Sequence, residues 1–227
     1  MKKVNKFKSF FDFSFFGYDF VKVTGIVPAM LFYRVKKIYI NKEQKKDFNK
    51  NSVIIAANHS DFLDPILLAL GFYNKRLGIV ATKELFDTPA KNAFFSFSHV
   101  IKVDKEKPSI KTFKEVKKVV DNGHSIAIFP EGTIHDHNLG VQPYKPGAIM
   151  MASMTKAPIY PVYIKKRKHW TERLTFIIGE KFDVQDYCKG KSPTAAEMQV
   201  IADKLYEKEK ELEAYAKTLW VKYILKK

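Results

Sequence analysis

VIIAANHSDFLDPILL, residues 53–68, contains the transition that decides the fold. Val53–Ala57 is an almost continuously apolar run, which is typical of a strand buried on both faces of a sheet. The apolar residues Ile66–Leu68 predict a helix, with Asp64 as its N-cap and Pro65 at its first helical position. A buried strand that leads directly into a helix is the repeating unit of a parallel α/β sheet.

The same alternation continues on both sides of this unit. Further strands are predicted at Lys37–Ile40, Leu77–Ala81, Val100–Val103, Ser125–Phe129, Ile159–Ile164 and Leu174–Ile178. Further helices are predicted at Glu84–Phe97, Ile110–Val120, Gly147–Thr155 and, from the spacing of apolar residues by three, four and seven, over 193–227. We therefore expect an α/β fold with a mainly parallel mixed sheet, flanking helices and a long C-terminal helix.

The N-terminal residues 1–34 are strongly aromatic and are expected to form an amphipathic helical hairpin. Two short helices are predicted, joined near Pro28 and followed by the basic residues Arg34, Lys36 and Lys37. Aromatic side chains beside cations suit the lipid headgroup boundary, but the same residues would also suit a cover over the core. Because acids and Lys22 interrupt the run, neither a transmembrane span nor a signal peptide is predicted. The whole chain is interpreted as one domain, with the hairpin, a core over 35–180 and the C-terminal helix.

The composition restricts the classes of protein and partner. With 46% hydrophobic residues in 227, the chain has enough apolar material for a continuous core. Lys and Arg number 40 against 24 acids, a net charge of +16, part of which can reflect a Lys-rich genome. The excess favours an anionic partner such as a bilayer, a phosphorylated small molecule or a nucleic acid. Cys188 is the single cysteine, which excludes an internal disulfide and fits a reducing, cytoplasmic compartment.

The first group of chemically active residues is Asn58, His59 and Asp64. It follows the buried strand and precedes the helix, which is where open α/β sheets bind ligands. A neutral imidazole can take a proton from a hydroxyl, and a carboxylate on its far nitrogen sets the tautomer and stabilises the cation. The alternative is that Asp64 is only an N-cap and His59 a structural loop residue.

His99 and Asp104 repeat the spacing of His59 and Asp64. If this second pair lies along the strand Val100–Val103, an odd separation sends the two side chains to opposite faces. We therefore expect no catalytic pair there.

The second and third groups are suited to binding an anionic substrate. Gly132 allows close approach of the backbone to a ligand, and Glu131 is a plausible acceptor for a substrate hydroxyl, although an ordinary strand-ending turn is the alternative. Ammonium groups near strand ends bind phosphate, although each could be an ordinary surface residue: Lys83, Lys105 and Lys145. His135 and His137 lack a third ligand, so no metal site is expected.

In order and with compatible gaps, these segments resemble the lysophosphatidate and glycerolipid acyltransferase family over roughly residues 35–180. The segments that carry the resemblance are Asn58–Asp64, Lys83–Phe86 with Pro89, Val100–Lys105, Phe129–Thr133, and Tyr144–Ala148 followed by Ala157–Val162.

The resemblance implies an enzyme that moves a fatty acyl group from acyl-CoA or acyl carrier protein onto the hydroxyl of lysophosphatidate in phospholipid biosynthesis. His59 would be the general base and Asp64 would orient it. The implied substrate-binding residues are Asn58, Lys83, Lys105, Glu131, Gly132, Thr133 and Lys145. The implied partner is an anionic bilayer and not a nucleic acid, with peripheral or monotopic attachment at the cytoplasmic face and no metal or organic cofactor.

Three positions depart from the family pattern. His99 and Lys105 stand where the second motif usually has Gly and Arg, and Ile134 stands where the third usually has Arg. An aliphatic side chain cannot replace a bidentate phosphate ligand. The acceptor therefore stays open between lysophosphatidate, glycerol phosphate and another lysophospholipid. A basic nucleic-acid-binding or lipid-binding protein without catalysis is the further alternative.

Overall fold

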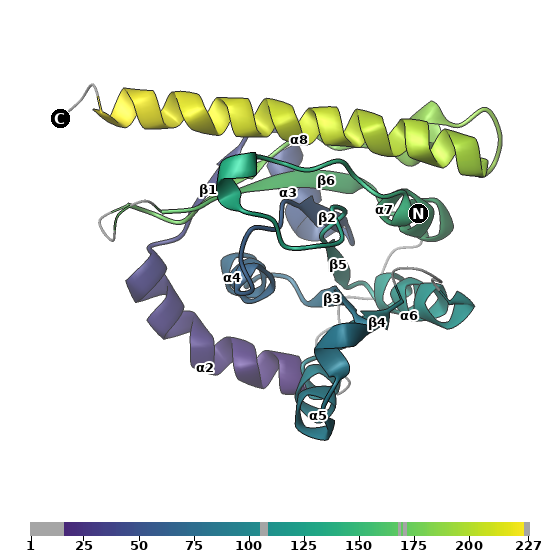
Figure 1. Cartoon of the computed structure of the whole chain (residues 1–227), viewed down its shortest axis with the longest axis horizontal. Coiled ribbons are helices and arrows are strands. Elements are labelled where there is room, and N and C mark those ends of the chain that lie inside the picture. The colour runs from purple at the N-terminus through teal and green to yellow at the C-terminus, as the bar shows by residue number, and fades with distance from the viewer. Residues whose placement is uncertain (1–15, 105–108, 168, 170–171, 225–227) are drawn as a thin grey trace.

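Seven strands form one sheet in the part of the chain that the computed structural model describes, which is residues 16–104, 109–167, 169 and 172–224. The strand order is β1-β7-β6-β2-β5-β3-β4, and helices cover the sheet on both faces (Figure 1). The strands are β1 Lys36–Tyr39, β2 Ile54–Ala57, β3 Leu77–Thr82, β4 Val100–Val103, β5 Ser125–Ile128, β6 Ile159–Lys165 and β7 Thr175–Ile178.

Neighbouring strands are parallel except for β6 and β7, which are antiparallel. The helices are α2 Phe16–Tyr33, α3 Gln44–Lys50, α4 Asp64–Gly71, α5 Pro89–Phe97, α6 Ile110–Asp121, α7 Gly147–Thr155 and α8 Ala195–Ile224. The expected mainly parallel mixed sheet and long C-terminal helix are confirmed. α3 is a short helix that was not expected from the sequence.

The connections bring the ends of β2 and β5 together at a reversal of the chain. From β2 the chain passes through α4 to β3, beyond β5, whereas from β5 it passes through α7 to β6, on the other side of β2. Ligands in open α/β sheets bind at such a switch point, beyond the carboxyl ends of the two strands. The residues that follow β2 and β5 are therefore placed side by side.

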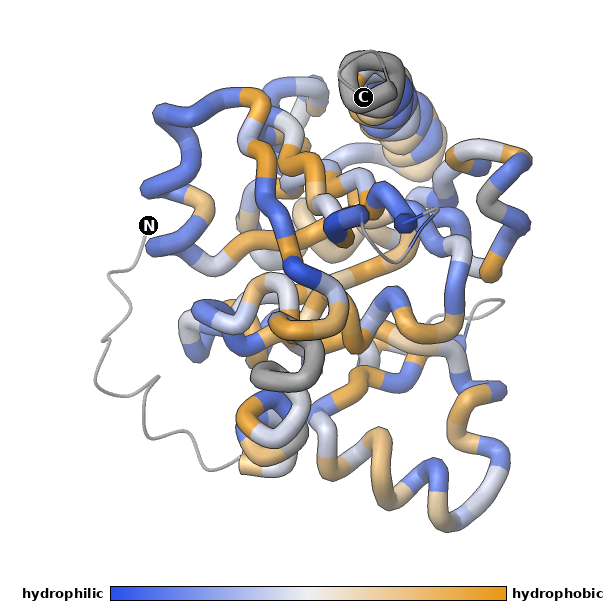
Figure 2. The backbone as a smooth tube through the Cα atoms, turned by 90° about the vertical axis from the view of Figure 1, so that its left-hand side faces the viewer, coloured by the Kyte–Doolittle hydropathy of each residue, from blue (hydrophilic) through white to orange (hydrophobic). Residues whose placement is uncertain are grey.

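Opposite sides of the sheet are covered by different helices. On β7, Phe176 is fully buried and its ring lies against Gly71 at the end of α4. On the other side, Leu212 of α8 lies near Gly179 and Pro161. The central strands β2 and β5 consist of buried residues. The long helix α8, which ends at the C-terminus, carries many hydrophilic residues (Figure 2).

No helix within the described residues is both long enough and apolar enough to cross a bilayer. The prediction of two N-terminal helices is wrong for the described part, because α2 continues from Phe16 to Tyr33 through Pro28. Proline inside a helix costs about 3 kcal/mol. α2 packs against α4 and α5, and Asp19 in its first turns forms an ion pair with Arg76 at 2.5 Å, so tertiary contacts act against that cost. Residues 1–15 of the predicted hairpin lie outside the described residues.

Two other local predictions are corrected. Asp64 is the first residue of α4 and not its N-cap, because its carboxylate turns back onto the preceding loop. The single helix predicted at Glu84–Phe97 is divided into a short 3₁₀ turn and α5. The division occurs because Thr88 caps α5 and Pro89 occupies its first position.

Replacement of Gly71 by Ala tests the contact between α4 and the sheet. A Cβ at Gly71 would overlap the buried ring of Phe176, so we expect a loss of about 1–3 kcal/mol in the free energy of unfolding. Gly147→Ala is the matched control, because a Cβ there meets nothing within 4 Å and Ala favours the helix by up to about 1 kcal/mol. Urea denaturation of both variants measures their free energies of unfolding. Equal stability of the two variants would contradict the close contact between Gly71 and Phe176.

Candidate active site

His59 and Asp64 meet in the turn between β2 and α4. The Nδ1 atom of His59 is 3.2 Å from Oδ2 of Asp64, and Asp64 is fully buried. The imidazole stacks on the ring of Phe129, with centroids 4.1 Å apart. With Nδ1 held by the carboxylate, Nε2 is the nitrogen left to exchange a proton with a substrate.

The carboxylate of Asp64 also organises the loop that carries His59. Its Oδ2 atom accepts hydrogen bonds from the backbone N–H groups of Ser60 at 2.9 Å and Asp61 at 2.8 Å. Burial alone would raise the pKa of Asp64. The hydrogen bond with His59 and the charge of Lys166 outweigh burial and hold the pKa below its usual value. Asp64 is therefore ionised whenever the imidazole needs a counter-charge.

Lys166 completes the surroundings of Asp64 from the far side. It follows β6, its Nζ atom contacts Oδ1 of Asp64, and it lies 3.8 Å from Oδ2 of Asp61. The two oxygens of Asp64 therefore face different groups, His59 with the loop amides on one side and an ammonium on the other. Lys166 could not be recognised from the sequence, because one Lys among many carries no local signal.

The loop after β5 is joined to the same turn through the backbone of His59. The N–H of His59 donates to Oε1 of Glu131 at 3.4 Å, and the C=O of His59 accepts from the N–H of His135 at 3.0 Å. Glu131 is buried, and this burial raises its pKa to about 7 despite the hydrogen bond from His59. Glu131 thus supports the His59 loop, and it borders a small polar cavity beside His59.

A second buried acid lies behind Glu131, on α8. Glu209 is fully buried, and within the described residues neither of its oxygens has a hydrogen-bond partner. Burial, followed by the charge of Glu131, raises the pKa of Glu209 well above its usual value. Burial likewise raises the pKa of the neighbouring Tyr144 hydroxyl. A neutral Glu209 is the state that this environment favours.

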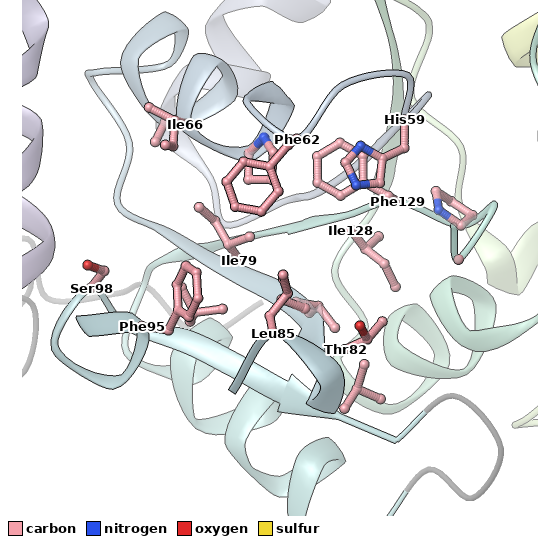
Figure 3. A pocket seen from close by; sticks show the side chains of 18 of the residues that line it. His59, Phe62, Ile66, Ile79, Thr82, Leu85, Phe95, Ser98, Ile128 and Phe129 are labelled. Carbon is pink, nitrogen blue, oxygen red and sulfur yellow. The ribbon is translucent and has the colours of Figure 1, made fainter. Parts of the chain in front are cut away.

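A cavity of about 630 Å³ extends from the His59 ring between β3, β4 and the helices α2, α4 and α5. Figure 3 shows His59 and Phe129 at one end and Ser98 at the other, with Ile79 and Leu85 between them. The walls are predominantly aliphatic and aromatic. Because His59 is one of the lining residues, a molecule in this cavity would lie next to the imidazole.

The structure distributes the predicted substrate-binding residues over several positions. Gly132, at φ +77°, lines the large cavity with Thr133 and Lys145, and a Cβ at Gly132 would lie 3.2 Å from Lys145 Nζ. Asn58 instead forms a hydrogen bond with β6, in which its Oδ1 atom accepts from the N–H of Ile164 at 2.7 Å. Lys83 pairs with Asp104 at 2.7 Å.

Lys105 lies outside the described residues. Within the part of the chain that is described, no three His, Cys, Asp or Glu side chains are arranged to hold a metal ion. The arrangement can take a proton from a hydroxyl at His59 beside an apolar compartment.

Comparison with known proteins identifies relatives of this chain. A family model described as "Acyltransferase" matches residues 37–165. The chain is 29% identical over 179 residues to the 1-acyl-sn-glycerol-3-phosphate acyltransferase of Bacillus subtilis, which covers 74% of this chain and 87% of that protein. It is 30% identical over 146 residues to the protein of the same name from Saccharomyces cerevisiae, covering 61% of this chain and 48% of the yeast protein.

A solved structure has the same fold. The crystal structure of the 1-acyl-sn-glycerophosphate acyltransferase PlsC from Thermotoga maritima matches with a TM-score of 0.57 at 21% identity. The match covers 94% of this chain and 84% of that one.

Glu209→Gln tests the neutral state of the buried acid. In the folded protein the pKa of Glu209 lies above its unfolded value, so its contribution to stability is complete below about pH 4.5 and is lost as the pH rises through the folded pKa. Gln keeps the shape without the charge, so we expect little change at pH 5. At pH 8 we expect a gain of about 1–3 kcal/mol, measured by thermal unfolding.

The matched control is Glu207→Gln on the same helix, where the side chain is exposed and pairs with Lys210. This control should shift the melting temperature little at either pH. A Glu209→Gln protein that is destabilised equally at both pH values would contradict the neutral acid.

Proposed function

The chain belongs to the acyltransferase family, and from that membership we propose that it transfers a fatty acyl group from acyl-CoA or acyl carrier protein to the free hydroxyl of lysophosphatidate. The observation that carries the proposal is the His59–Asp64 pair at one end of a large apolar cavity. The names of the two curated relatives support lysophosphatidate as the acceptor.

In the proposed reaction, Nε2 of His59 takes the proton of the acceptor hydroxyl as the oxygen attacks the thioester carbonyl. The tetrahedral adduct then collapses, the C–S bond breaks, and the departing thiolate receives the proton from the imidazolium. Asp64 holds the imidazole in the correct tautomer and stabilises its charged form. General base catalysis of this kind is typically worth about 10²–10⁴ in rate, and the remainder comes from holding both substrates together.

The cavity is the proposed compartment for the acyl chain. Its volume of about 630 Å³ lies within the range of sites for small ligands, and its lining is predominantly apolar. Burial of an acyl chain contributes about 0.8 kcal/mol per CH₂ group. This binding energy would hold the thioester next to His59 while the carrier stays outside.

The acceptor phosphate is proposed to bind beside Gly132. The exposed Lys145 lies close to Gly132, and both line the cavity near Thr133. An ammonium group and a glycine turn are suited to a phosphate. Ile134 lines the cavity as well but carries no charge. Recognition of the acceptor phosphate would therefore depend on Lys145, Gly132 and Thr133.

Attachment to an anionic bilayer surface is proposed for the face of α2 that points away from the domain. Phe16, Phe20, Val23 and Leu31 are exposed and, at 100° per residue, share one side of the helix. Arg167 stacks on the ring of Phe32 at 4.6 Å near the end of α2. Apolar side chains flanked by cations suit the headgroup boundary, and the net charge of +16 favours anionic lipids. The cytoplasmic face is the proposed side, because phospholipid synthesis with CoA or carrier-protein thioesters needs access to them.

His59→Ala compared with His99→Asn tests the catalytic assignment. Asn is used because His99 has φ +59°, a backbone conformation that Asn tolerates. The assay measures transfer of the labelled acyl group from acyl-CoA to each of three acceptors in turn: lysophosphatidate, glycerol phosphate and a lysophosphatidylcholine. We expect His59→Ala to lose about 10²-fold or more in kcat/KM, and His99→Asn to keep most of the activity.

Equal loss in both folded variants would mean that the wrong histidine has been assigned. Preference for another acceptor would replace lysophosphatidate in the proposal and leave the acyl transfer in place.

A triple variant, Phe16→Ser, Phe20→Ser and Val23→Ser, tests membrane attachment. Loss of three apolar side chains from the exposed face of α2 should weaken flotation with anionic liposomes about tenfold or more. The control replaces two exposed apolar residues elsewhere, Leu139→Ser and Val200→Ser. Unchanged flotation of the triple variant would disprove docking through α2. If the protein retained a nucleic-acid duplex at physiological salt, the alternative of a basic nucleic-acid-binding protein would be favoured.

A further inference from the structure

Lys166 is the one described cation that contacts the carboxylate of the proposed catalytic pair. Its side chain is 18% exposed, and its Nζ atom contacts Oδ1 of Asp64, the oxygen opposite the one that faces His59. Asp61 is 3.8 Å from the same Nζ and is itself half exposed. The Asp64 carboxylate therefore lies between an imidazole and an ammonium.

The position of Lys166 bears on the protonation of His59, because a buried carboxylate beside an imidazole favours the protonated ring. A general base must be neutral when the acceptor hydroxyl arrives, and it must release the proton again to the leaving thiolate. A cation on the far oxygen of Asp64 reduces the net charge that the ring experiences. Because Lys166 contacts the other oxygen, Oδ2 of Asp64 stays available for the hydrogen bond that orients the His59 ring.

On the basis of the proposed function, we propose that Lys166 is a positioning residue that balances the charge of Asp64, so that His59 is neutral at the start of the reaction. Lys166 itself does not touch the substrates in this role. It acts through Asp64. Lys166 lies just after β6, and 102 residues of sequence separate it from Asp64.

Other charged or titratable groups surround the pair from each neighbouring element. They are Asp61 in the same turn, Glu131 and His135 after β5, Lys145 before α7, Tyr163 on β6, Glu209 and Glu213 on α8, and Lys22 on α2. Glu131 and His135 meet the backbone of His59 and not its ring. Within the described residues, Asp64 is the group that hydrogen-bonds the ring, and Lys166 is the cation that contacts Asp64.

Lys166→Met tests the proposal through the pH dependence of kcat/KM. Without the ammonium, the ring should hold its proton to higher pH, so we expect the acidic limb of the profile to move up by about one pH unit. Lys166→Arg keeps the charge and should leave the limb near its wild-type position. The matched control is Lys165→Met, which removes the neighbouring cation that pairs with Glu172 at 3.4 Å, and should not move the limb.

A second measurement does not depend on turnover. NMR of histidine-labelled protein, with the His59 signal assigned from its absence in His59→Ala, follows the protonation of the ring directly. In Lys166→Met this titration should move in the same direction and by a similar amount. Lys166→Gln is made alongside and carries the same expectation, in case the Met variant does not fold.

Either of two results would overturn the proposal. One is a limb and a His59 titration that stay within about 0.2 pH unit of the wild type in the folded variants. The other is a higher KM for the phosphate acceptor with an unchanged profile, which would make Lys166 a substrate ligand. If the wild type transferred no acyl group, the proposed function would fail, whereas the NMR titration would still test the link between Lys166 and His59.

Discussion

The buried carboxylate of Asp64 is the constraint on which the rest of the site depends. A carboxylate without solvent exposure is tolerated only when each oxygen has partners. Oδ2 receives the N–H groups of Ser60 and Asp61 and faces Nδ1 of His59, while Oδ1 faces Lys166. One side chain thereby fixes the shape of the loop, the orientation of the imidazole and the position of a cation that follows β6, a strand adjacent to β2 but distant in sequence. Loss of any of these partners would leave a buried charge with too few contacts, so the geometry is held as a unit.

The topology of the sheet explains why this unit borders the cavity. Because β2 and β5 are neighbours at a reversal of connection order, the His59 turn and the loop carrying Glu131 converge at the same edge. Helices α2, α4 and α5 lie on one side of this edge and enclose an apolar space that reaches the imidazole. The same helix α2 that presents exposed aromatic residues also borders the cavity, through Tyr18 and Lys22. An apolar substrate that entered from a lipid surface would therefore meet the cavity close to the proposed attachment face.

Much of this arrangement could be predicted from the sequence, because strands buried on both faces and their helices leave a clear pattern. β2, the turn after it and the loop after β5 follow from runs of apolar residues and from Gly132, and so the meeting of the two loops could be expected. Interactions that depend on tertiary contact could not. Asp64 was expected either to cap the helix or to pair with His59, and its contact with Lys166, 102 residues along the chain, has no signal in the motif. Lys166 and Glu209 are far from the motifs and belong to abundant residue types, so only packing identifies them. The continuation of α2 through Pro28 likewise depends on its neighbours, and the propensity of proline argues the other way.

The site contains acids whose pKa values are shifted in opposite directions, and this difference has a consequence for the imidazole. Asp64, with its amides and cation, has a pKa below the usual value, whereas burial raises the pKa of Glu131 to about 7 and that of Glu209 well above its usual value. Environments that separate the pKa values of neighbouring acids also separate their roles. If Glu131 and Glu209 were both ionised, further negative charges would stand near His59 and would favour its protonated form. Neutral or partly neutral acids provide the hydrogen-bonding shape of the loop without that charge, which leaves Asp64, balanced by Lys166, as the anion that the ring experiences most directly.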